Sequence, residues 1–468
     1  MTVSYSPGSS FSRRFATPTT AVSSPRKAPL LAHDRLSRGP LQPGDEHSSL
    51  DARCVSTRVT MSAQWVKATR AFAAKLSMIV LSGTLLMIAA MIRNNKCTSA
   101  SRASAMLRRI ESPIGAQLVV DGRTLLNFGG TSYLGLGAEP SMLEAGAQAL
   151  RSQGATGTIP RHYGFATPAN LDAEAAALEY FGVEAAIYFA TGYLFGLVGM
   201  AGLASRFDVA ILDESTHYNL RDGALAAGKP VQTFRHVDAD DLARVLEREI
   251  SAGNRPLVAT DGMFPTFGTV PPLAEYARLL APHAGWMLVD ESHAFGVLGA
   301  GGRGAVEHHG VAGPLVVAGG SLGKAFGAYG GIAVGSTEAI CDLWKSPASR
   351  GAASGMSSGA AMAAASMRFL RQHPERLATL RANARRLKTG LRQLGLAIVD
   401  SDGPVATFVH GTAATMQALQ ADLMVMGIYV IYSTYVGAGP EGAIRCAAFA
   451  DHEPSDIDRL VEAISRLL

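Results

Sequence analysis

Cysteine is scarce in this chain of 468 residues: Cys54, Cys97, Cys341 and Cys446 are the only four, and no two form a Cys-x-x-Cys pair. Their spacing argues against a disulfide framework and a structural zinc, so we expect reduced thiols, a cytoplasmic setting and no bound metal. Charged residues are also few, at 17%, whereas hydrophobic residues make up 48% and glycines number 50. This balance argues against wholesale disorder and favours a glycine-rich α/β enzyme.

Positive charge is lacking where a nucleic-acid-binding face would need it. Residues 1–105 contain 14 Lys or Arg against 4 Asp or Glu, whereas residues 106–468 contain 28 against 34. The net charge of +4 therefore arises from the first segment, and the remainder is acidic. Because a basic footprint is expected on a folded face, we expect no nucleic-acid partner.

The first 105 residues have the composition of a leader. Residues 1–60 are rich in Ser, Thr, Pro and Arg, and the first forty hold six basic residues and one acid, Asp34. We expect this segment not to fold alone. Two interpretations are open: a transit-like targeting segment, or an extension ahead of the true start, since Met106 is placed to begin a complete enzyme.

One long uncharged run lies inside the leader. Residues 76–92 (LSMIVLSGTLLMIAAMI) form an apolar stretch of 17 residues between Lys75 and Arg93. That length is at the lower limit of the about 17 to 25 residues that cross a bilayer, and Ser, Gly and Thr dilute its middle. We interpret it as a marginal transmembrane helix that could anchor a cytoplasmic catalytic body.

From Met106 onward, short β-branched runs alternate with amphipathic stretches, which is typical of a parallel sheet covered by helices. Apolar residues recur three and four apart in the predicted helices 170–180, 239–250 and 272–280. The predicted strands are residues 185–189, 209–212, 231–234, 257–260, 287–290, 315–318 and 331–334.

The C-terminal part has a different rhythm, which predicts a second, smaller domain. From Gly359 a long helical stretch is interrupted at Pro374, and shorter strands and a final helix over 454–467 follow. We therefore expect four segments, namely a leader (1–105), an N-terminal arm (106–150), a large domain (151–350) and a small C-terminal domain (351–468).

An acid and a lysine follow two of the predicted strands. Asp290 ends the strand 287–290, and Lys324, thirty-four residues later, lies in a glycine-rich turn after the strand 315–318. Ligand-binding groups collect at the carboxyl ends of parallel strands, so both residues are candidates for a site. A pyridoxal phosphate enzyme needs an amine to form a Schiff base and a carboxylate to keep the ring nitrogen protonated. The pair matches both needs.

Two motifs carry a resemblance to a known family. DESHAFGVLGAGGRG (290–304) and GGSLGKAFGAYGG (319–331) resemble the α-oxoamine synthases, pyridoxal phosphate enzymes that join an amino acid to an acyl thioester with loss of carbon dioxide. The resemblance extends from about Leu125 to the C-terminus. It implies an α/β, aspartate-aminotransferase-like fold (fold type I), with a large, mostly parallel sheet domain that binds the cofactor and a smaller C-terminal α/β domain. It also implies a homodimer with shared active sites.

The resemblance implies roles for four residues around the ring of pyridoxal 5'-phosphate. Lys324 resembles the Schiff-base lysine, which also removes the Cα proton, and Asp290 resembles the partner of the pyridinium nitrogen. His293 resembles the histidine that hydrogen-bonds the phenolic oxygen. His217, in DESTHYNLRDG, resembles the histidine that stacks on the ring, although Tyr218 and Asn219 replace the small residues that usually follow it.

The cofactor phosphate has four candidate partners. ATGYLFG (190–196) resembles the family's turn into a helix, where the amides of Gly192 and Tyr193 would bind the phosphate at a helix N-terminus. Ser321, three residues before Lys324, would add a hydroxyl group. Ser357 is expected to reach a phosphate across the dimer interface.

Two residues are candidates for binding the substrate. Arg445 resembles the family's C-terminal arginine, whose planar guanidinium pairs with the amino-acid carboxylate in a geometry that lysine cannot offer. Thr131 lies before Tyr-Leu-Gly-Leu, where the family often has an asparagine-containing segment. One expected carboxylate contact is therefore missing, and the identity of the amino acid stays open.

The leading hypothesis is a PLP-dependent acyltransferase that condenses an amino acid with an acyl thioester of coenzyme A or a carrier protein. Serine palmitoyltransferase, 8-amino-7-oxononanoate synthase and aminoketobutyrate-type synthases all fit. One alternative is a non-catalytic scaffold subunit of such a synthase, against which Lys324, Asp290 and His217 argue. The other is an aminotransferase on the same fold, against which the Asp-Glu-Ser-His motif and the glycine-rich turn argue.

Overall fold

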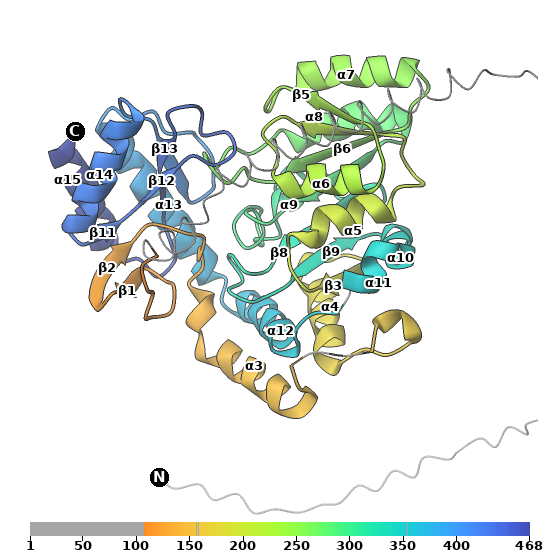
Figure 1. Cartoon of the computed structure of the whole chain (residues 1–468), viewed down its shortest axis with the longest axis horizontal. Helices are drawn as coiled ribbons and strands as arrows, with labels where there is room; N and C mark the ends of the chain where they lie inside the picture. Colours follow the sequence, from red (N-terminus) through yellow and green to blue (C-terminus); the bar gives the residue numbers. More distant parts are fainter. Residues whose placement is uncertain (1–106, 156, 158, 353) are drawn as a thin grey trace, which may run out of the picture. The chain divides into compact units, whose positions relative to one another are not determined.

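The computed structural model describes residues 107–155, 157, 159–352 and 354–468 (Figure 1). All of them lie in the second of two compact units of the chain, Thr98–Leu468. The predicted leader and its apolar run 76–92 fall outside the described residues. Within the described ranges, no helix combines the length and apolar character needed to cross a membrane.

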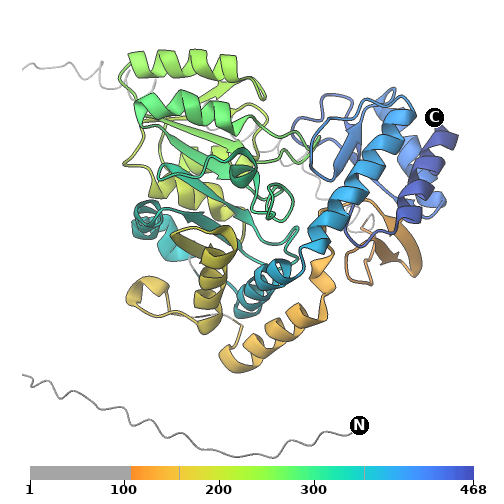
Figure 2. The same cartoon turned by 180° about the vertical axis from the view of Figure 1, so that it is seen from behind.

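Helices and strands alternate along most of the described chain (Figures 1 and 2). The strands are β1 (Gln117–Val120), β2 (Arg123–Asn127), β3 (Ala185–Phe189), β4 (Val209–Asp213), β5 (Val231–Phe234), β6 (Pro256–Asp261), β7 (Trp286–Asp290), β8 (Val316–Ser321), β9 (Gly331–Gly335), β10 (Val405–Phe408), β11 (Ile428–Tyr429), β12 (Ile431–Ser433) and β13 (Ala443–Ala447). The α-helices are α3 (Pro140–Gln153), α4 (Pro168–Phe181), α5 (Leu194–Gly202), α6 (Tyr218–Ala226), α7 (Ala239–Ser251), α8 (Leu273–Leu280), α9 (Ala305–His309), α10 (Thr337–Lys345), α11 (Pro347–Ala352), α12 (Ser357–Gln372), α13 (Glu375–Gln393), α14 (Ala413–Val425) and α15 (Pro454–Leu467). Short 3-10 helices are η1 (Leu136–Ala138), η2 (Arg161–Tyr163) and η3 (Ala281–His283).

The central sheet has seven strands in the order β3-β9-β8-β7-β6-β4-β5, and within it only β9 runs antiparallel to its neighbours. All seven strands predicted from the sequence are present, and β3 and β5 have the predicted bounds. The mostly parallel α/β sheet of the predicted fold class is confirmed.

Alternate residues of each strand face two different hydrophobic cores, as strand geometry requires. Along β4, Val209 and Ile211 pack in a core with α4, α7, α8 and α12, whereas Ala210 and Leu212 pack in a core with α5, α6 and α10. The helices thus cover both faces of the sheet (Figures 1 and 2). A sheet buried on both faces explains why its strands are nearly continuous apolar runs in the sequence.

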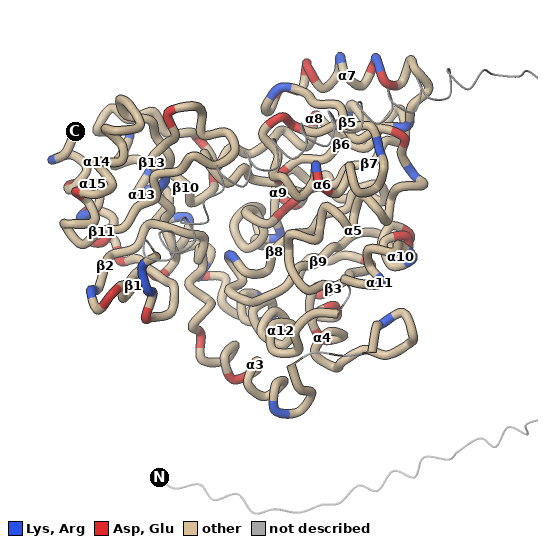
Figure 3. The backbone as a smooth tube through the Cα atoms, in the orientation of Figure 1, with Lys and Arg blue, Asp and Glu red and all other residues tan. Residues whose placement is uncertain are grey.

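Helix α7 shows how an outer helix is specified. The Asp238 side chain caps it by accepting a hydrogen bond from the Asp241 amide at 2.8 Å. Leu242 and Leu246 are buried, and basic and acidic positions follow one another along the helix (Figure 3). Arg244 pairs with Asp241 at 2.9 Å, an exposed contact between residues three apart.

The C-terminal segment forms a separate core that includes residues from the N-terminal arm. Strand β2 pairs in parallel with β11, some 300 residues away, and the small sheet β10-β13-β12 is antiparallel. Leu126 and Phe128 pack in one cluster with Leu387 and Leu460. Helix α12, in contrast, packs on α3 and α4 and contributes to the core of the large sheet.

These contacts suggest other domain limits than the ones expected from the sequence, which divided the chain at residues 150 and 350. We propose that residues 107–128 belong with the C-terminal domain and that α12 belongs with the large domain. The boundary then falls within α13, between Leu380 in the large core and Ala384 in the small one. The sequence contains no local pattern from which the pairing of β2 with β11 could have been predicted.

Candidate active site

A cavity of about 180 Å³ lies at the carboxyl ends of the central strands. Asp261 at the end of β6, Asp290 at the end of β7 and Gly319 on β8 are register partners, so the strand ends form one edge. The lining residues are Gly192, Tyr193, His217, Asn219, Asp261, Asp290, Ser292, His293, Ser321 and Lys324. Seven of them were selected from the sequence, whereas Asn219, Asp261 and Ser292 were not.

Lys324 is the amine of this cavity. Burial lowers its pKa to about 8, although the carboxyl groups of Asp290 and Asp261 act in the opposite direction. A lysine with a pKa near 8 has a substantial neutral fraction at neutral pH, which a nucleophile or a base requires. The environment of Lys324 therefore suits the role predicted for it.

The Asp290 carboxylate is held from both sides. Its Oδ1 accepts a hydrogen bond from the Ser292 amide at 2.9 Å, and its Oδ2 accepts one from Asn219 Nδ2 at 2.7 Å. Gly320 lies so close that a Cβ there would stand 2.8 Å from Oδ1. Donors that point at a carboxylate favour its ionised form, which is the form that can pair with a pyridinium.

Asp261 is a second buried acid beside Asp290. Its Oδ2 accepts hydrogen bonds from Thr216 Oγ1 and from the His217 amide, both at 2.8 Å. Burial raises the pKa of Asp261, and the neighbouring Asp290 raises it further. We therefore expect Asp261 to hold a proton near neutral pH and to position the segment that carries His217.

His293 is oriented by a chain of hydrogen bonds. Arg445 Nη2 donates to Tyr133 Oη at 3.1 Å, and Tyr133 Oη lies 2.8 Å from His293 Nδ1. In the tautomer with the imidazole proton on Nε2, the Tyr133 hydroxyl donates to Nδ1 while its oxygen accepts from the arginine. Burial, followed by the charges of Lys324 and Arg445, lowers the pKa of His293 well below its usual value. Its burial and these charges therefore favour the neutral ring, which with its proton on Nε2 can donate a hydrogen bond from that nitrogen.

Arg445 and Thr131, the predicted substrate-binding residues, do not line the cavity. The buried guanidinium of Arg445 also donates to the carbonyl groups of Pro265 at 2.8 Å and Gly130 at 3.0 Å. Thr131 contributes its backbone carbonyl, which accepts from the Tyr133 amide at 2.8 Å. Both residues contact the site through Tyr133, and their contact with a substrate stays a prediction.

His217 lies at the N-cap of α6 and is surrounded by aromatic side chains. Its Nδ1 is 2.8 Å from Asn219 Oδ1. The ring centroids of Tyr193, Tyr218 and Tyr435 lie 5.8 Å, 6.0 Å and 6.0 Å from that of His217. The three tyrosines are 50%, 52% and 40% exposed, so we call them the aromatic rim of the cavity.

The end of β8 and the start of α5 touch at the position predicted for the phosphate. A Cβ at Gly192 would lie 2.3 Å from Ser321 Cα, so the approach is open only to glycine. The Ser321 amide donates to Ser292 Oγ at 2.8 Å, and the Gly323 amide donates to Ser321 Oγ at 3.1 Å. A glycine cradle at a helix N-terminus beside a hydroxyl group suits an anionic phosphate.

Ser357 does not line this cavity. It is buried at the start of α12, where its hydroxyl donates to the Gly154 carbonyl and its amide donates to the Ala155 carbonyl at 2.9 Å. A role at a phosphate of the partner subunit therefore stays a prediction.

Four residues of the site were missed by sequence reasoning, and Asp261, Asn219 and Tyr133 show how the available signal differed. Asp261 directly follows the predicted strand 257–260, so the rule that selected Asp290 also applied to it. Asn219 had been noted only as a departure from the family. Tyr133 left no signal, because its contact with His293 joins residues 160 positions apart.

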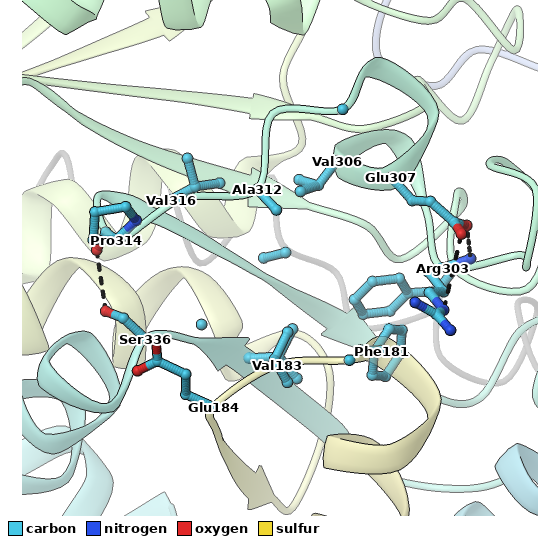
Figure 4. Close-up of a pocket in the computed structure, with 17 residues that line it drawn as sticks. Phe181, Val183, Glu184, Arg303, Val306, Glu307, Ala312, Pro314, Val316 and Ser336 are labelled. Atoms are coloured by element: carbon cyan, nitrogen blue, oxygen red, sulfur yellow. Dashed lines mark hydrogen bonds and ion pairs between the residues drawn. The ribbon is translucent and has the colours of Figure 1, made fainter.

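A larger cavity of about 540 Å³ lies elsewhere in the large domain (Figure 4). Its walls are mostly apolar, with Arg303 and Glu307 together on one side. On the opposite side the Ser336 hydroxyl donates to the Pro314 carbonyl at 3.1 Å. It contains none of the ten residues of the smaller cavity, so chemistry rather than size identifies the candidate active site.

The sheet, with a half-buried lysine and a buried acid at the carboxyl ends of its strands, defines the class: a fold type I pyridoxal phosphate enzyme. A family profile, "Aminotransferase class I and II", matches residues 123–464. The chain is 34% identical over 366 residues to the 8-amino-7-oxononanoate synthase of Methylococcus capsulatus, covering 76% of this chain and 93% of the relative. It is 34% identical over 377 residues to the Alkalilimnicola ehrlichii enzyme, covering 78% and 94%.

Solved structures agree with these relatives. The serine palmitoyltransferase of Sphingomonas wittichii superimposes with a TM-score of 0.72 at 27% identity, covering 80% of this chain and 96% of that one. A serine palmitoyltransferase of S. paucimobilis bound to PLP and myriocin has a TM-score of 0.72 at 25% identity, covering 77% and 92%. The chain therefore belongs to the aminotransferase class I and II family, and it is a PLP-dependent acyltransferase of the α-oxoamine synthase type. The predicted family, fold class, cofactor and enzyme class are confirmed.

Proposed function

We propose that the protein condenses an amino acid with an acyl thioester, releasing carbon dioxide and the free thiol and leaving an α-aminoketone. The observation that carries this proposal is the presence of Lys324, Asp290, His293 and His217 around one cavity. Relatives named 8-amino-7-oxononanoate synthase support the same reaction type.

Each site residue has a defined task in this proposal. Pyridoxal phosphate, when bound, supplies the electron sink that stabilises a carbanion at the substrate Cα. Lys324 removes the Cα proton as a neutral amine and returns a proton at the end. Asp290 holds the ring nitrogen in its charged form, and His293 donates from Nε2 to the phenolic oxygen. Gly192, Tyr193 and Ser321 hold the phosphate.

The aromatic rim supports an acyl group as the second substrate. Tyr193, Tyr218 and Tyr435 surround His217 and present half-exposed ring surface at the edge of the cavity. Apolar chains pack favourably on such rings, which suits the hydrocarbon part of an acyl group.

The substrates can be identified from the products that the relatives' names describe. An 8-amino-7-oxononanoate skeleton divides into alanine and a seven-carbon ω-carboxyacyl group, whereas a serine palmitoyltransferase joins serine to palmitoyl. The experiment offers alanine, serine and glycine, each with both thioesters, and measures thiol release and product mass. We expect one pair to react much faster than the others, and Lys324→Ala to abolish thiol release. Amino-group transfer to a keto acid without thiol release would indicate an aminotransferase instead.

Assembly belongs to the same proposal. We propose a homodimer in the cytoplasm whose active sites are shared between subunits, with Ser357 facing the partner's cofactor. Light scattering after size-exclusion chromatography gives the mass of the assembly. A catalytically competent monomer would contradict the shared site, and a wild-type protein that binds no PLP would indicate the scaffold subunit.

A further inference from the structure

Asn219 joins the two cofactor-facing residues that come from different strand ends. Its Nδ2 donates to Asp290 Oδ2 at 2.7 Å, and its Oδ1 lies 2.8 Å from His217 Nδ1. A carboxylate only accepts hydrogen bonds, so the amide nitrogen faces Asp290 and the amide oxygen faces the imidazole. The Asn219 backbone amide also points at this nitrogen, at 3.3 Å, so two groups of Asn219 meet His217 Nδ1. In the tautomer with its proton on Nδ1, the imidazole donates to Asn219 Oδ1 through the shorter contact of 2.8 Å.

The backbone of Asn219 is held firmly enough to give this contact a fixed geometry. Asn219 is 2% exposed and lies in the first turn of α6. Helix α5 approaches so closely that a Cβ on Gly196 would stand 2.0 Å from the Asn219 carbonyl oxygen. On the other side, Asp261 holds the preceding His217 amide at 2.8 Å. The side chain therefore spans a fixed distance between two fixed partners.

We propose that Asn219 is a positioning residue that locks the His217 imidazole and the Asp290 carboxylate into one unit, so that ring stacking and pairing with the ring nitrogen are set together. This rests on the assignment of His217 and Asp290 to the cofactor in the proposed function. The sequence supports a specific role, because the family has a small residue where this chain has an asparagine that reaches both groups. The Asn219 side-chain amide and the Ser292 backbone amide together supply one hydrogen-bond donor to each carboxylate oxygen of Asp290.

Two variants, of which only the aspartate is isosteric with asparagine, separate positioning from packing. Asn219→Ala removes both contacts and leaves a small void. Asn219→Asp keeps the shape and an oxygen for His217, but it places a carboxylate against Asp290. If Asn219 only fills space, the aspartate variant binds the cofactor better than the alanine variant. If Asn219 bridges the two groups, the order is reversed.

The test is the dissociation constant of pyridoxal phosphate, titrated by visible absorbance with no amino acid or thioester present. We expect a weakening of about tenfold for Asn219→Ala and of about a hundredfold for Asn219→Asp. The control is Asn383→Ala, which removes a buried asparagine that donates to the Phe449 and His452 carbonyl groups away from the site. This control should change the constant by less than about twofold. Aspartate binding the cofactor more tightly than alanine overturns the proposal.

A double-mutant cycle measures the coupling directly. In a His217→Ala background, the effect of Asn219→Ala should shrink by about fivefold, because one of its two partners is already gone. Strictly additive effects would show that Asn219 acts without His217 and would overturn the bridge. Thermal unfolding of each apo variant identifies any that fails to fold.

The readout separates this inference from the reaction proposed above. Cofactor binding requires neither the amino acid nor the thioester, so a protein that fails to release thiol can still give the predicted order of constants. Conversely, an active synthase in which the aspartate variant binds the cofactor as well as wild type retains its function and refutes the bridge.

Discussion

Two lysines of this molecule, the half-buried Lys324 and the buried Lys388, have pKa values shifted in the same direction but have different roles. Burial lowers the pKa of Lys324 to about 8, and it lowers the pKa of Lys388 to about 8 as well. Lys388 lies on α13 in the C-terminal domain and donates from Nζ to the Ser401 carbonyl at 2.6 Å and to Ser401 Oγ at 3.0 Å. Both acceptors are uncharged oxygens, so they satisfy the hydrogen-bonding capacity of the amine and fix the loop that contains Ser401.

Lys324 differs in its surroundings rather than in its pKa. The carboxyl groups of Asp290 and Asp261 act on its pKa, and it lines a cavity that also contains His217 and His293. Within the described part of the chain no hydrogen bond holds its amine. A shifted pKa therefore marks burial, whereas an unbound amine facing paired acids at strand ends marks a site for chemistry.

The largest expected effect comes from replacing each lysine by arginine. Lys324→Arg keeps a positive charge but removes an amine that can lose its proton, so we expect thiol release to fall by about 10⁴-fold or more. Lys388→Arg should retain activity within about threefold, because only its hydrogen bonds to the loop change. Steady-state thiol release at saturating amino acid makes the comparison. Equal losses in both variants would place Lys388 in the mechanism and contradict the contrast.

The two acids beside Lys324 offer the next comparison. Asp290→Asn removes the negative charge expected to pair with the ring nitrogen, and we expect kcat/KM to fall by about 10² to 10³-fold. The raised pKa of Asp261 leaves that group protonated near neutral pH, so asparagine mimics it and Asp261→Asn should lose less than about tenfold. The pH profile of kcat/KM is recorded for both. A larger loss for Asp261→Asn would show that Asp261 carries the functional charge.

The sequence predicted the large sheet well for a physical reason. Each of its strands is a short apolar run buried on both faces, such as β7, so local composition is sufficient to identify it. The strand-end rule then placed Asp290 and Lys324 near each other without any knowledge of the fold. The family motifs added His217 and His293, which also line the cavity.

Contacts between segments that are far apart in the sequence and have no clear hydrophobic pattern could not be predicted. Strand β11 has two residues, and its pairing with β2 has no local signature. The chain from Arg445 through Tyr133 to His293 joins three separate parts of the sequence. The hydrogen bond from Arg445 to the Tyr133 hydroxyl was therefore not foreseen, and the expected contact of Arg445 with the substrate stays a prediction.

Tyr133→Phe tests that hydrogen-bond chain and should have a smaller effect. Burial raises the pKa of Tyr133, so its hydroxyl stays protonated and can donate to His293 Nδ1. Without the hydroxyl, the His293 tautomer is no longer fixed, and we expect kcat to fall about tenfold with KM for the amino acid within about twofold. If KM rises and kcat stays unchanged, Tyr133 contacts the substrate instead of positioning His293.

The smallest expected effect concerns Lys388 and the pH dependence of the free energy of unfolding, without any effect on activity. Its pKa is about 8 in the folded protein against about 10.5 when unfolded, so between these values the unfolded chain binds more protons. Stability linked to this group therefore increases as the pH rises through the folded value, by about 1 kcal/mol between about pH 7 and pH 9. Denaturant unfolding of the wild type and of Lys388→Met, in which nothing titrates at this position, isolates the contribution. We expect the unfolding free energy of the wild type, relative to that of Lys388→Met, to increase by about 1 kcal/mol between about pH 7 and pH 9. Parallel curves would mean that the Ser401 oxygens keep Lys388 charged, which would leave Lys324 as the one amine of the two that loses its proton near neutral pH.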